Sequence, residues 1–161
     1  MITTQSDIVG IKITQLREIK DERGAVLHML RSDAEDFSQF GECYFSEVLP
    51  NAVKAWKKHI IQTQNIAVPV GRIRLVIFDN RENSPSQGKL IIMELGRPDA
   101  YQRVQIPPGI WYGFTCISKT PALIANCANH PHTQSESLLV DVNDHTIPYS
   151  WAYNKRIEDN K

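Results

Sequence analysis

The feature that most constrains the fold is a series of short apolar or alternating runs separated by turn residues. The clearest runs are Val26–Leu30, Cys43–Val48, Val53–Ile61, Ile73–Asp79, Lys89–Leu95, Tyr101–Ile106, Phe114–Ser118 and Ala122–Cys127. Turn-forming segments such as 21–24, 80–88 and 107–109 separate them, with Gly, Pro, Asn or Asp at the turns. Eight or more short strands at this spacing predict an all-β jelly-roll or barrel-like sandwich.

Helix is nearly absent from the pattern. The stretch from Ser32 to Phe40 predicts one short helix, because Ser32 can cap it while Asp33 and Glu35 occupy its first turn. The tail after Tyr149 is a second candidate for a short helix. No repeat or linker divides the chain, so we expect a single domain over residues 1–161.

Charge and cysteine content narrow the function classes. Lys plus Arg and Asp plus Glu number 18 each among 161 residues, so no net charge attracts nucleic acid or a membrane surface. Cys43, Cys116 and Cys127 lack the paired spacing of a metal or redox motif, which suits thiols in a reducing compartment. The N-terminal stretch has no signal-peptide pattern and no apolar run could cross a bilayer, so we expect a cytoplasmic protein.

The predicted strand from Val53 to Gln62 carries the most chemistry. With a period of two, Lys57 and His59 share one face with Val53, whereas Trp56 shares the other face with Lys58. If the first face is internal, it places a histidine, a suitable general base, in a ligand-filled interior. In the opposite register the tryptophan packs inside and the lysines are solvated. The pattern alone favours neither register.

Two further segments are ambiguous. The turn 107–109 is followed by Trp111 and Tyr112, which can stack on a base or sugar or can serve as ordinary packing. His130 and His132 could chelate a metal, but no third ligand is evident nearby, and a loop with solvated histidines is the better interpretation of the pair. We therefore predict no metal site.

Five segments in one order along the chain resemble the motifs of a known family. They are Asp21-Glu22-Arg23-Gly24, the strand ending in His59 with Gln62 after it, Phe78–Gly88, Ile106–Phe114 and Asn143-Asp144. In this order they are similar to the D-x-R-G, H-x-Q, V-D-x-R-x-x-S-P-x-x-G, I-P-x-G-x-x-H-G-F and D-P segments of the dTDP-4-dehydrorhamnose 3,5-epimerases. The resemblance covers the chain from about Ile13 to Trp151.

The resemblance implies a dimeric cupin jelly-roll, or double-stranded β-helix, that uses no metal or organic cofactor. It implies a partner that is a nucleoside-diphosphate sugar, and a reaction that removes and returns a proton next to the C4 ketone of a 4-keto-6-deoxy sugar. In this interpretation His59 is the base, Asp144 orients it, and Arg23 binds the diphosphate. The other residues that we expect to contact substrate are Lys57, Gln62, Gln64 and Trp111.

The chain also departs from the family pattern. Trp56 stands in place of the family's arginine, so Lys57 or Lys58 must supply that charge, and Gln64 stands in place of its lysine. The family's acid tyrosine aligns with Ala125, and the histidine of its H-G-F turn is Tyr112. Two hypotheses remain. In one, Tyr112 or a water returns the proton and the chain is an epimerase or isomerase; in the other, it is a catalytically silent protein that binds the sugar nucleotide.

Overall fold

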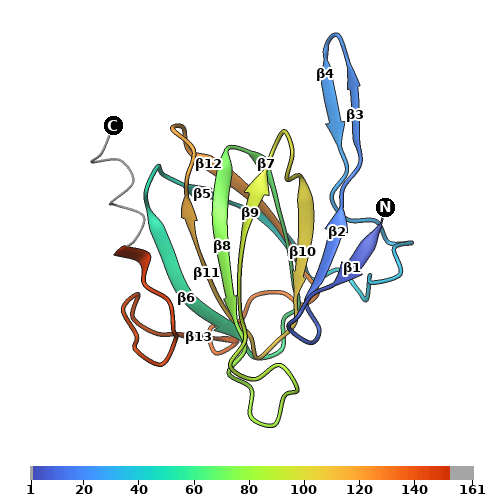
Figure 1. Cartoon of the computed structure of the whole chain (residues 1–161). Helices are drawn as coiled ribbons and strands as arrows, with labels where there is room; N and C mark the ends of the chain where they lie inside the picture. The colour runs from blue at the N-terminus through green and yellow to red at the C-terminus, as the bar shows by residue number, and fades with distance from the viewer. Residues whose placement is uncertain (1, 153–161) are drawn as a thin grey trace.

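The computed structural model describes residues 2–152 and consists almost entirely of antiparallel β-strands (Figure 1). The first sheet has the order β1-β2-β10-β7-β12-β5, and the second has the order β13-β6-β11-β8-β9. The strands of the first sheet are β1 (Thr3–Gln5), β2 (Lys12–Gln15), β10 (Gln102–Ile106), β7 (Gln64–Val70), β12 (Ala122–Ala128) and β5 (Glu42–Val48). The strands of the second sheet are β13 (Ser137–Leu139), β6 (Val53–His59), β11 (Trp111–Cys116), β8 (Arg72–Phe78) and β9 (Leu90–Gly96).

The core lies between the two sheets. Inward-facing side chains of β7 and β8, among them Ile66, Val68, Ile73, Leu75 and Ile77, are 0–1% exposed. Their spacing of two is the alternation that a half-buried strand requires. The order of strands is not sequential, so neighbours in each sheet come from distant parts of the chain, as in a jelly-roll. The prediction of an all-β jelly-roll is confirmed.

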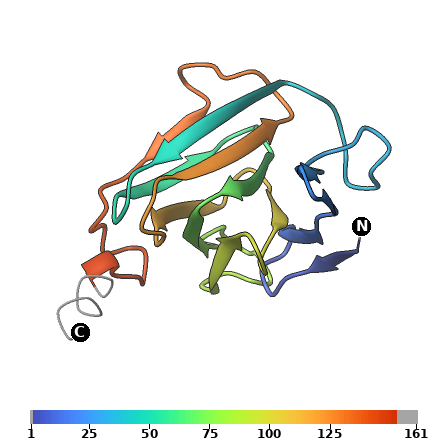
Figure 2. The ribbon, with the colours of Figure 1, turned by 90° about the horizontal axis from the view of Figure 1, so that it is seen from above.

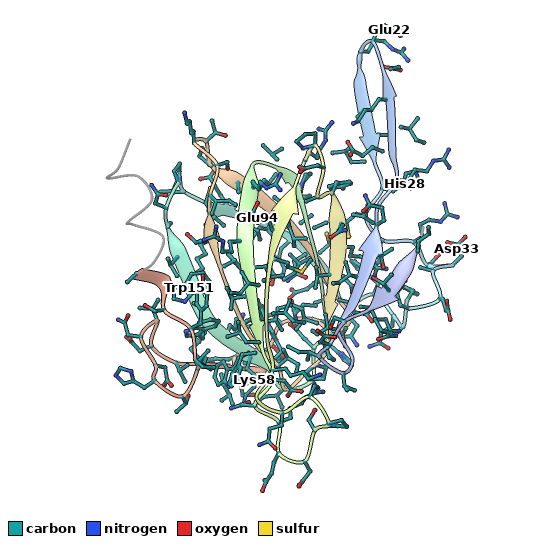
Figure 3. All side chains as sticks on the ribbon, in the orientation of Figure 1. Glu22, His28, Asp33, Lys58, Glu94 and Trp151 are labelled. Atoms are coloured by element: carbon teal, nitrogen blue, oxygen red, sulfur yellow. The ribbon has the colours of Figure 1, made fainter. Side chains whose placement is uncertain are left out.

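Part of the outer face of the second sheet, over β6, β11 and β8, is buried as well. Trp56, Trp111 and Phe78 form a second apolar cluster with Ile147 and Trp151 of the C-terminal segment. Figure 3 shows Trp151 beside β6. The C-terminal segment therefore covers β6 from outside, and this explains why β8 reads as a continuous apolar run rather than an alternating one.

A β-bulge in β6 reconciles the two registers that the sequence left open. Tyr112 pairs with Lys57, but Phe114 pairs with Lys54, so two residues of β6 oppose the single residue Gly113. A Cβ on Gly113 would lie 2.5 Å from the Cβ of Ala55, so this position has no room for a side chain. From Trp56 onward the alternation is regular, with Trp56 in the outer cluster and Lys57 and His59 facing the interior. The extra residue changes the side of Val53, which packs against the outer cluster although it would otherwise share a face with Lys57.

The short helix predicted over Ser32–Phe40 is wrong. This segment contains only isolated turns, closed by hydrogen bonds from Ala34 N–H to the Arg31 carbonyl and from Phe37 N–H to the Ala34 carbonyl. The Asp36 carboxylate instead accepts hydrogen bonds from the buried Arg103 side chain at 2.7 and 2.8 Å. This tertiary ion pair overrides the local helix signal. Of the predicted C-terminal helix, only a short 3₁₀ turn at Trp151–Ala152 is described, and the rest lies outside the described residues.

The strands β3 (Glu18–Asp21) and β4 (Gly24–Leu27) form a separate hairpin that projects beyond the two sheets (Figure 1). Figure 3 labels Glu22 at its tip, far from the body of the molecule. Seen from above, the N-terminal strands lie on the side opposite the C-terminal segment (Figure 2). The hairpin is therefore an arm at one edge of the first sheet.

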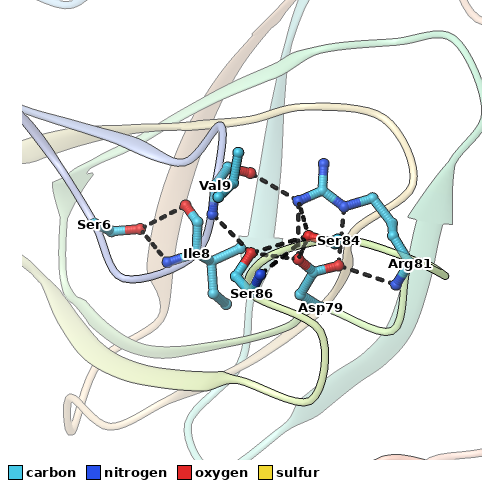
Figure 4. A network of polar contacts seen from close by, with 7 residues as sticks. All are labelled: Ser6, Ile8, Val9, Asp79, Arg81, Ser84 and Ser86. Atoms are coloured by element: carbon cyan, nitrogen blue, oxygen red, sulfur yellow. Dashed lines mark hydrogen bonds and ion pairs between the residues drawn. The ribbon is translucent and has the colours of Figure 1, made fainter.

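A buried carboxylate ties the long 79–89 loop to the N-terminal segment (Figure 4). Asp79 is 0% exposed and accepts hydrogen bonds from Arg81, Ser84 and Ser86. Ser86 Oγ accepts a hydrogen bond from Val9 N–H, and the Val9 carbonyl accepts one from Arg81. The network thus holds one end of the barrel together.

Within residues 2–152 no helix is long and apolar enough to cross a membrane.

Candidate active site

The end of β6 carries His59 into the interior, where two other strands meet it. His59 is 2% exposed; its Nδ1 lies 2.6 Å from Oε2 of Glu136, and its Nε2 lies 3.0 Å from the Tyr112 hydroxyl. Tyr112 comes from β11, the neighbour of β6 in the sheet, and its ring stacks on the imidazole at a centroid distance of 5.9 Å. Glu136 stands just before β13, which pairs with β6 on its other side. The three side chains form a buried polar row.

The charges of this row follow from its surroundings. Burial opposes ionisation of Glu136, but hydrogen bonds from His59 and from the backbone N–H groups of Gln62 and Ile61 hold its pKa below the ordinary value. Burial lowers the pKa of His59, and Glu136 only partly offsets this effect. Glu136 is therefore a carboxylate beside a neutral imidazole. Because Nδ1–H must donate to the carboxylate, Nε2 is left as the acceptor for the Tyr112 hydroxyl.

A cavity of about 270 Å³ opens next to Tyr112 between the two sheets. Small-molecule sites usually occupy about 300–1,000 Å³, so this cavity can take a compact group such as a sugar ring. Lys54, Lys57 and Tyr112 line it from the second sheet, and Tyr44 and Asn126 line it from the first sheet. Of the three side chains His59, Glu136 and Tyr112, Tyr112 is the one that lines the cavity. Its hydroxyl lies next to Nε2 of the imidazole.

A chain of hydrogen-bonded side-chain amides runs from Asn126, which lines the cavity, to Gln62. The side chain of Gln64 donates to Gln62 Oε1 at 2.7 Å and accepts from Asn126 Nδ2 at 2.5 Å. Asn126 Nδ2 also donates to the Tyr44 hydroxyl at 2.8 Å. Gln62 in turn donates to the carbonyl of His130, at 2.9 Å. The predicted residues Gln62 and Gln64 thus do not line the cavity themselves. The backbone N–H of Gln62 contacts Glu136, and the side chain of Gln64 contacts Asn126, which lines the cavity.

The expected pairing of His59 with Asp144 requires correction. Asp144 accepts hydrogen bonds from the backbone and hydroxyl of Thr146 and closes a local turn. Glu136 occupies the position beside Nδ1 instead. The reason is topological, since β13 places residues 136–139 along β6, whereas the later segment covers the outer face of the sheet.

Two other predicted residues lie away from the cavity. Trp111 is in the outer cluster, with the ammonium of Lys58 4.6 Å from its ring centroid. Arg23 is at the tip of the projecting hairpin, where its guanidinium pairs with Asp21 at 2.6 Å. Its side chain is 82% exposed and does not line the cavity.

The sequence pattern does not single out Glu136. It lies in an irregular segment with no alternation, and only its tertiary position next to β6 reveals its role. Among residues 2–152 no group of three or more His, Cys, Asp or Glu side chains is arranged to hold a metal ion.

The architecture and the site together define a cupin-type jelly-roll with a buried histidine–carboxylate pair next to an interior cavity. The dTDP-4-dehydrorhamnose 3,5-epimerase family model matches residues 5–161, and the chain belongs to this family of carbohydrate epimerases.

Two relatives agree with this assignment, and a third protein shares the fold. The chain is similar to a dTDP sugar isomerase from Desulfovibrio desulfuricans, with 51% identity, a TM-score of 0.89, and coverage of 94% of this chain and 95% of that one. It is 31% identical over 145 residues to a probable low-salt glycan biosynthesis epimerase of Haloferax volcanii, with 89% of each chain covered. A Legionella pneumophila epimerase crystallised with dTDP-4-keto-L-rhamnose shares the fold, with 19% identity, a TM-score of 0.81, and coverage of 93% of this chain and 82% of that one.

Proposed function

We propose that the protein epimerises a 4-keto-6-deoxy sugar carried on a nucleoside diphosphate, and that His59 is the base. The observation that carries the proposal is the buried pair of His59 and Glu136 at 2.6 Å, aligned with Tyr112 at the edge of a cavity. Family membership supplies the reaction class, and the names of the relatives place such enzymes in glycan biosynthesis.

The chemistry is the removal of a proton from a carbon next to the ketone. Because the Tyr112 hydroxyl donates to Nε2, its oxygen can take the proton from the sugar carbon while its own proton passes to the imidazole. The C–H bond breaks, its electron pair remains in the enolate, and the new imidazolium is stabilised by Glu136. Burial raises the pKa of Tyr112, so the tyrosine stays neutral before and after the transfer.

The negative charges of substrate and enolate need cations. Lys57 and Lys54 line the cavity from β6, and Lys54 Nζ is held by the Glu47 carbonyl at 2.7 Å. In the family pattern an arginine stands where this chain has Trp56. We propose that Lys57 supplies the positive charge in its place. A lysine provides a mobile point charge rather than a bidentate fork, so it tolerates a shift of the oxygen between ketone and enolate.

We further propose that the protein is a homodimer in which the β3–β4 hairpin reaches the partner's cavity. Arg23 lies in the turn between β3 and β4. These strands form an arm that projects from the barrel (Figure 1), and the arm exposes Val26 (61%) and Ile19 (44%). These apolar side chains on a projecting hairpin favour contact with another surface. Arg23 would then bind the diphosphate in the site of the second subunit.

A catalytically silent sugar-nucleotide-binding protein is the second candidate. The observation that favours it is on β12, where Ile124 and Asn126 line the cavity and Ala125 does not. This strand therefore brings no acid to the position expected for the family's tyrosine.

Proton exchange in deuterated water separates the two functions. The protein is incubated with a panel of thymidine, uridine and cytidine diphosphate 4-keto-6-deoxy sugars, and the sugar mass is followed. We expect a gain of one or more deuterium atoms with at least one member of the panel. Tight binding without any gain in mass would instead establish the silent protein.

A further inference from the structure

The epimerase proposed above needs a second proton donor, because an inverted centre must receive its proton from the face opposite to the one that lost it. His59 and Tyr112 both belong to the second sheet, on β6 and β11. A proton that returns from this row restores the original configuration. The donor for inversion must therefore lie on the wall that the first sheet contributes to the cavity.

The residues of the first sheet that line the cavity are Tyr44, Ser46, Ile66, Ile124 and Asn126. Among these five, Tyr44 carries the one side chain with a proton that ionises in the range available to proteins. Ser46 is engaged by the Lys54 ammonium at 3.1 Å, and Asn126 is neutral at every pH of interest. From these positions we propose that Tyr44, on β5, is the general acid that returns the proton to the sugar.

The hydrogen bonds around Tyr44 fix the direction of its proton. Asn126 Oδ1 accepts the backbone N–H of Asn65 at 3.2 Å, so the Nδ2 end of the amide must face Gln64 and Tyr44. Tyr44 Oη therefore accepts a hydrogen bond rather than donating one. Among the described residues no acceptor is assigned to its own O–H, which leaves this proton for a group in the cavity.

The same amide prepares the site for the charge that develops. As the proton leaves, the oxygen of Tyr44 becomes a phenolate, and the N–H of Asn126 is already 2.8 Å from it. Burial raises the pKa of Tyr44, and the hydrogen bond from Asn126 acts against this increase. The amide chain through Gln64 and Gln62 holds Asn126 in this orientation, and this gives the two glutamines a function in positioning.

The step balances without any further reactant. The Tyr44 O–H bond breaks, the electron pair of the enolate carbon forms the new C–H bond, and the phenolate remains on Tyr44. The imidazolium of His59 and the phenolate then return to their neutral forms by exchange with water. Tyr44 is 37% exposed, so water can reach it for this recovery.

The inference rests on the proposed function. A pair of variants shows whether a negative result refutes the role of Tyr44 or the epimerase function itself. Tyr44→Phe and Tyr112→Phe are each compared with Tyr101→Phe, which removes a tyrosine hydroxyl that binds the His28 carbonyl outside the cavity. The substrate is the 4-keto-6-deoxy sugar nucleotide that the parent protein turns over. Two rates are measured: deuterium uptake by mass spectrometry and formation of the inverted sugar by NMR.

For Tyr44→Phe we expect formation of the inverted sugar to fall about 100-fold or more, while deuterium uptake stays within about threefold of the Tyr101→Phe control. For Tyr112→Phe we expect uptake and inversion to fall together. Asn126→Ala should slow inversion by about tenfold through loss of its single hydrogen bond to the phenolate.

Inversion by Tyr44→Phe at the control rate would overturn the assignment of Tyr44 and leave the proposed function intact. Equal loss of uptake and inversion would also overturn it, because a donor acts only after the carbon has lost its proton. Absence of uptake in the parent would instead refute the proposed function itself.

Discussion

Nδ1 of His59 lies 2.6 Å from a Glu136 oxygen, and both side chains are at most 2% exposed. This contact sets the tautomer of the imidazole, because an ionised carboxylate can only accept. The other oxygen of Glu136 accepts the Gln62 N–H at 3.0 Å, so the carboxylate is fixed by the turn that follows β6. The strand that carries the base thus also holds the group that orients it.

Replacement of Glu136 by Gln should slow deuterium uptake by at least about 100-fold. The Gln oxygen would keep the bond to Gln62 N–H and turn its NH₂ group toward Nδ1. This forces the imidazole proton onto Nε2, where it can no longer accept from Tyr112. Uptake by mass spectrometry is the measurement, with Glu94→Gln on the exposed face of β9 as the control. Parent-like uptake in Glu136→Gln would remove Glu136 from the mechanism.

The pH dependence of uptake should have its acidic limb below pH 6.5. Burial lowers the pKa of His59, and the imidazole must be neutral to accept a proton. The rate constant kcat/KM therefore rises as pH increases through this lowered pKa and is level by about pH 7. Glu136 acts to raise the pKa of His59. In Glu136→Gln, the acidic limb of the remaining activity should therefore lie at lower pH than in the parent. A limb above pH 7 would contradict the neutral state that the structure assigns to His59.

Part of this site follows from the sequence. Alternation along Val53–Gln62 predicts that Lys57 and His59 share a face, and the structure has both facing the interior. The same alternation fails for Val53, because the bulge opposite Gly113 inserts a residue and changes the parity of β6. A period-two pattern carries no information about such an insertion.

The rest depends on contacts between distant segments. Glu136 and Tyr112 are 77 and 53 residues from His59, and only the strand order β13-β6-β11 brings them together. The cysteines are another case in which the sequence does not reveal which residues lie close together. Their spacing indicates no pairing, yet β5 and β12 place Cys43 opposite Cys127, with 3.3 Å between the sulfur atoms.

Replacement of Asp79 by Asn should lower the free energy of unfolding by about 3 kcal/mol. The Asn NH₂ group cannot accept from Arg81, Ser84 and Ser86, and the partly buried guanidinium loses its counter-charge. Urea unfolding at pH 7 measures the change. Asp33→Asn, which removes an exposed pair with Arg31, is the control and should leave the unfolding curve close to that of the parent.

The effect of Asp79 should depend on pH. Hydrogen bonds from Arg81, Ser86 and Ser84 outweigh burial and hold the pKa of Asp79 below its ordinary value of 3.8. Its stabilisation is therefore complete above pH 3.8 and is lost as pH falls through the lowered pKa. The difference between parent and Asp79→Asn should shrink only in strong acid. A difference that already disappears at pH 5 would contradict this account of the network.

A mixture of two inactive subunits tests the projecting arm. His59→Asn lacks the base, and Arg23→Ala lacks the cation at the hairpin tip. If the arm serves the partner's cavity, each mixed dimer has one complete site, so an equal mixture should recover about a quarter of the parent activity at low substrate concentration. Each variant alone and a mixture of His59→Asn with His59→Gln are the controls. Activity no greater than the sum of the separate variants would show that the arm does not cross between subunits.

The most direct measurement of the central claim is deuterium uptake by His59→Asn with the sugar nucleotide that the parent turns over. Asn has no basic nitrogen, so uptake should fall by at least about 1,000-fold while the variant remains folded by circular dichroism and still binds the nucleotide. Uptake at the parent rate would contradict the assignment of His59 as the base.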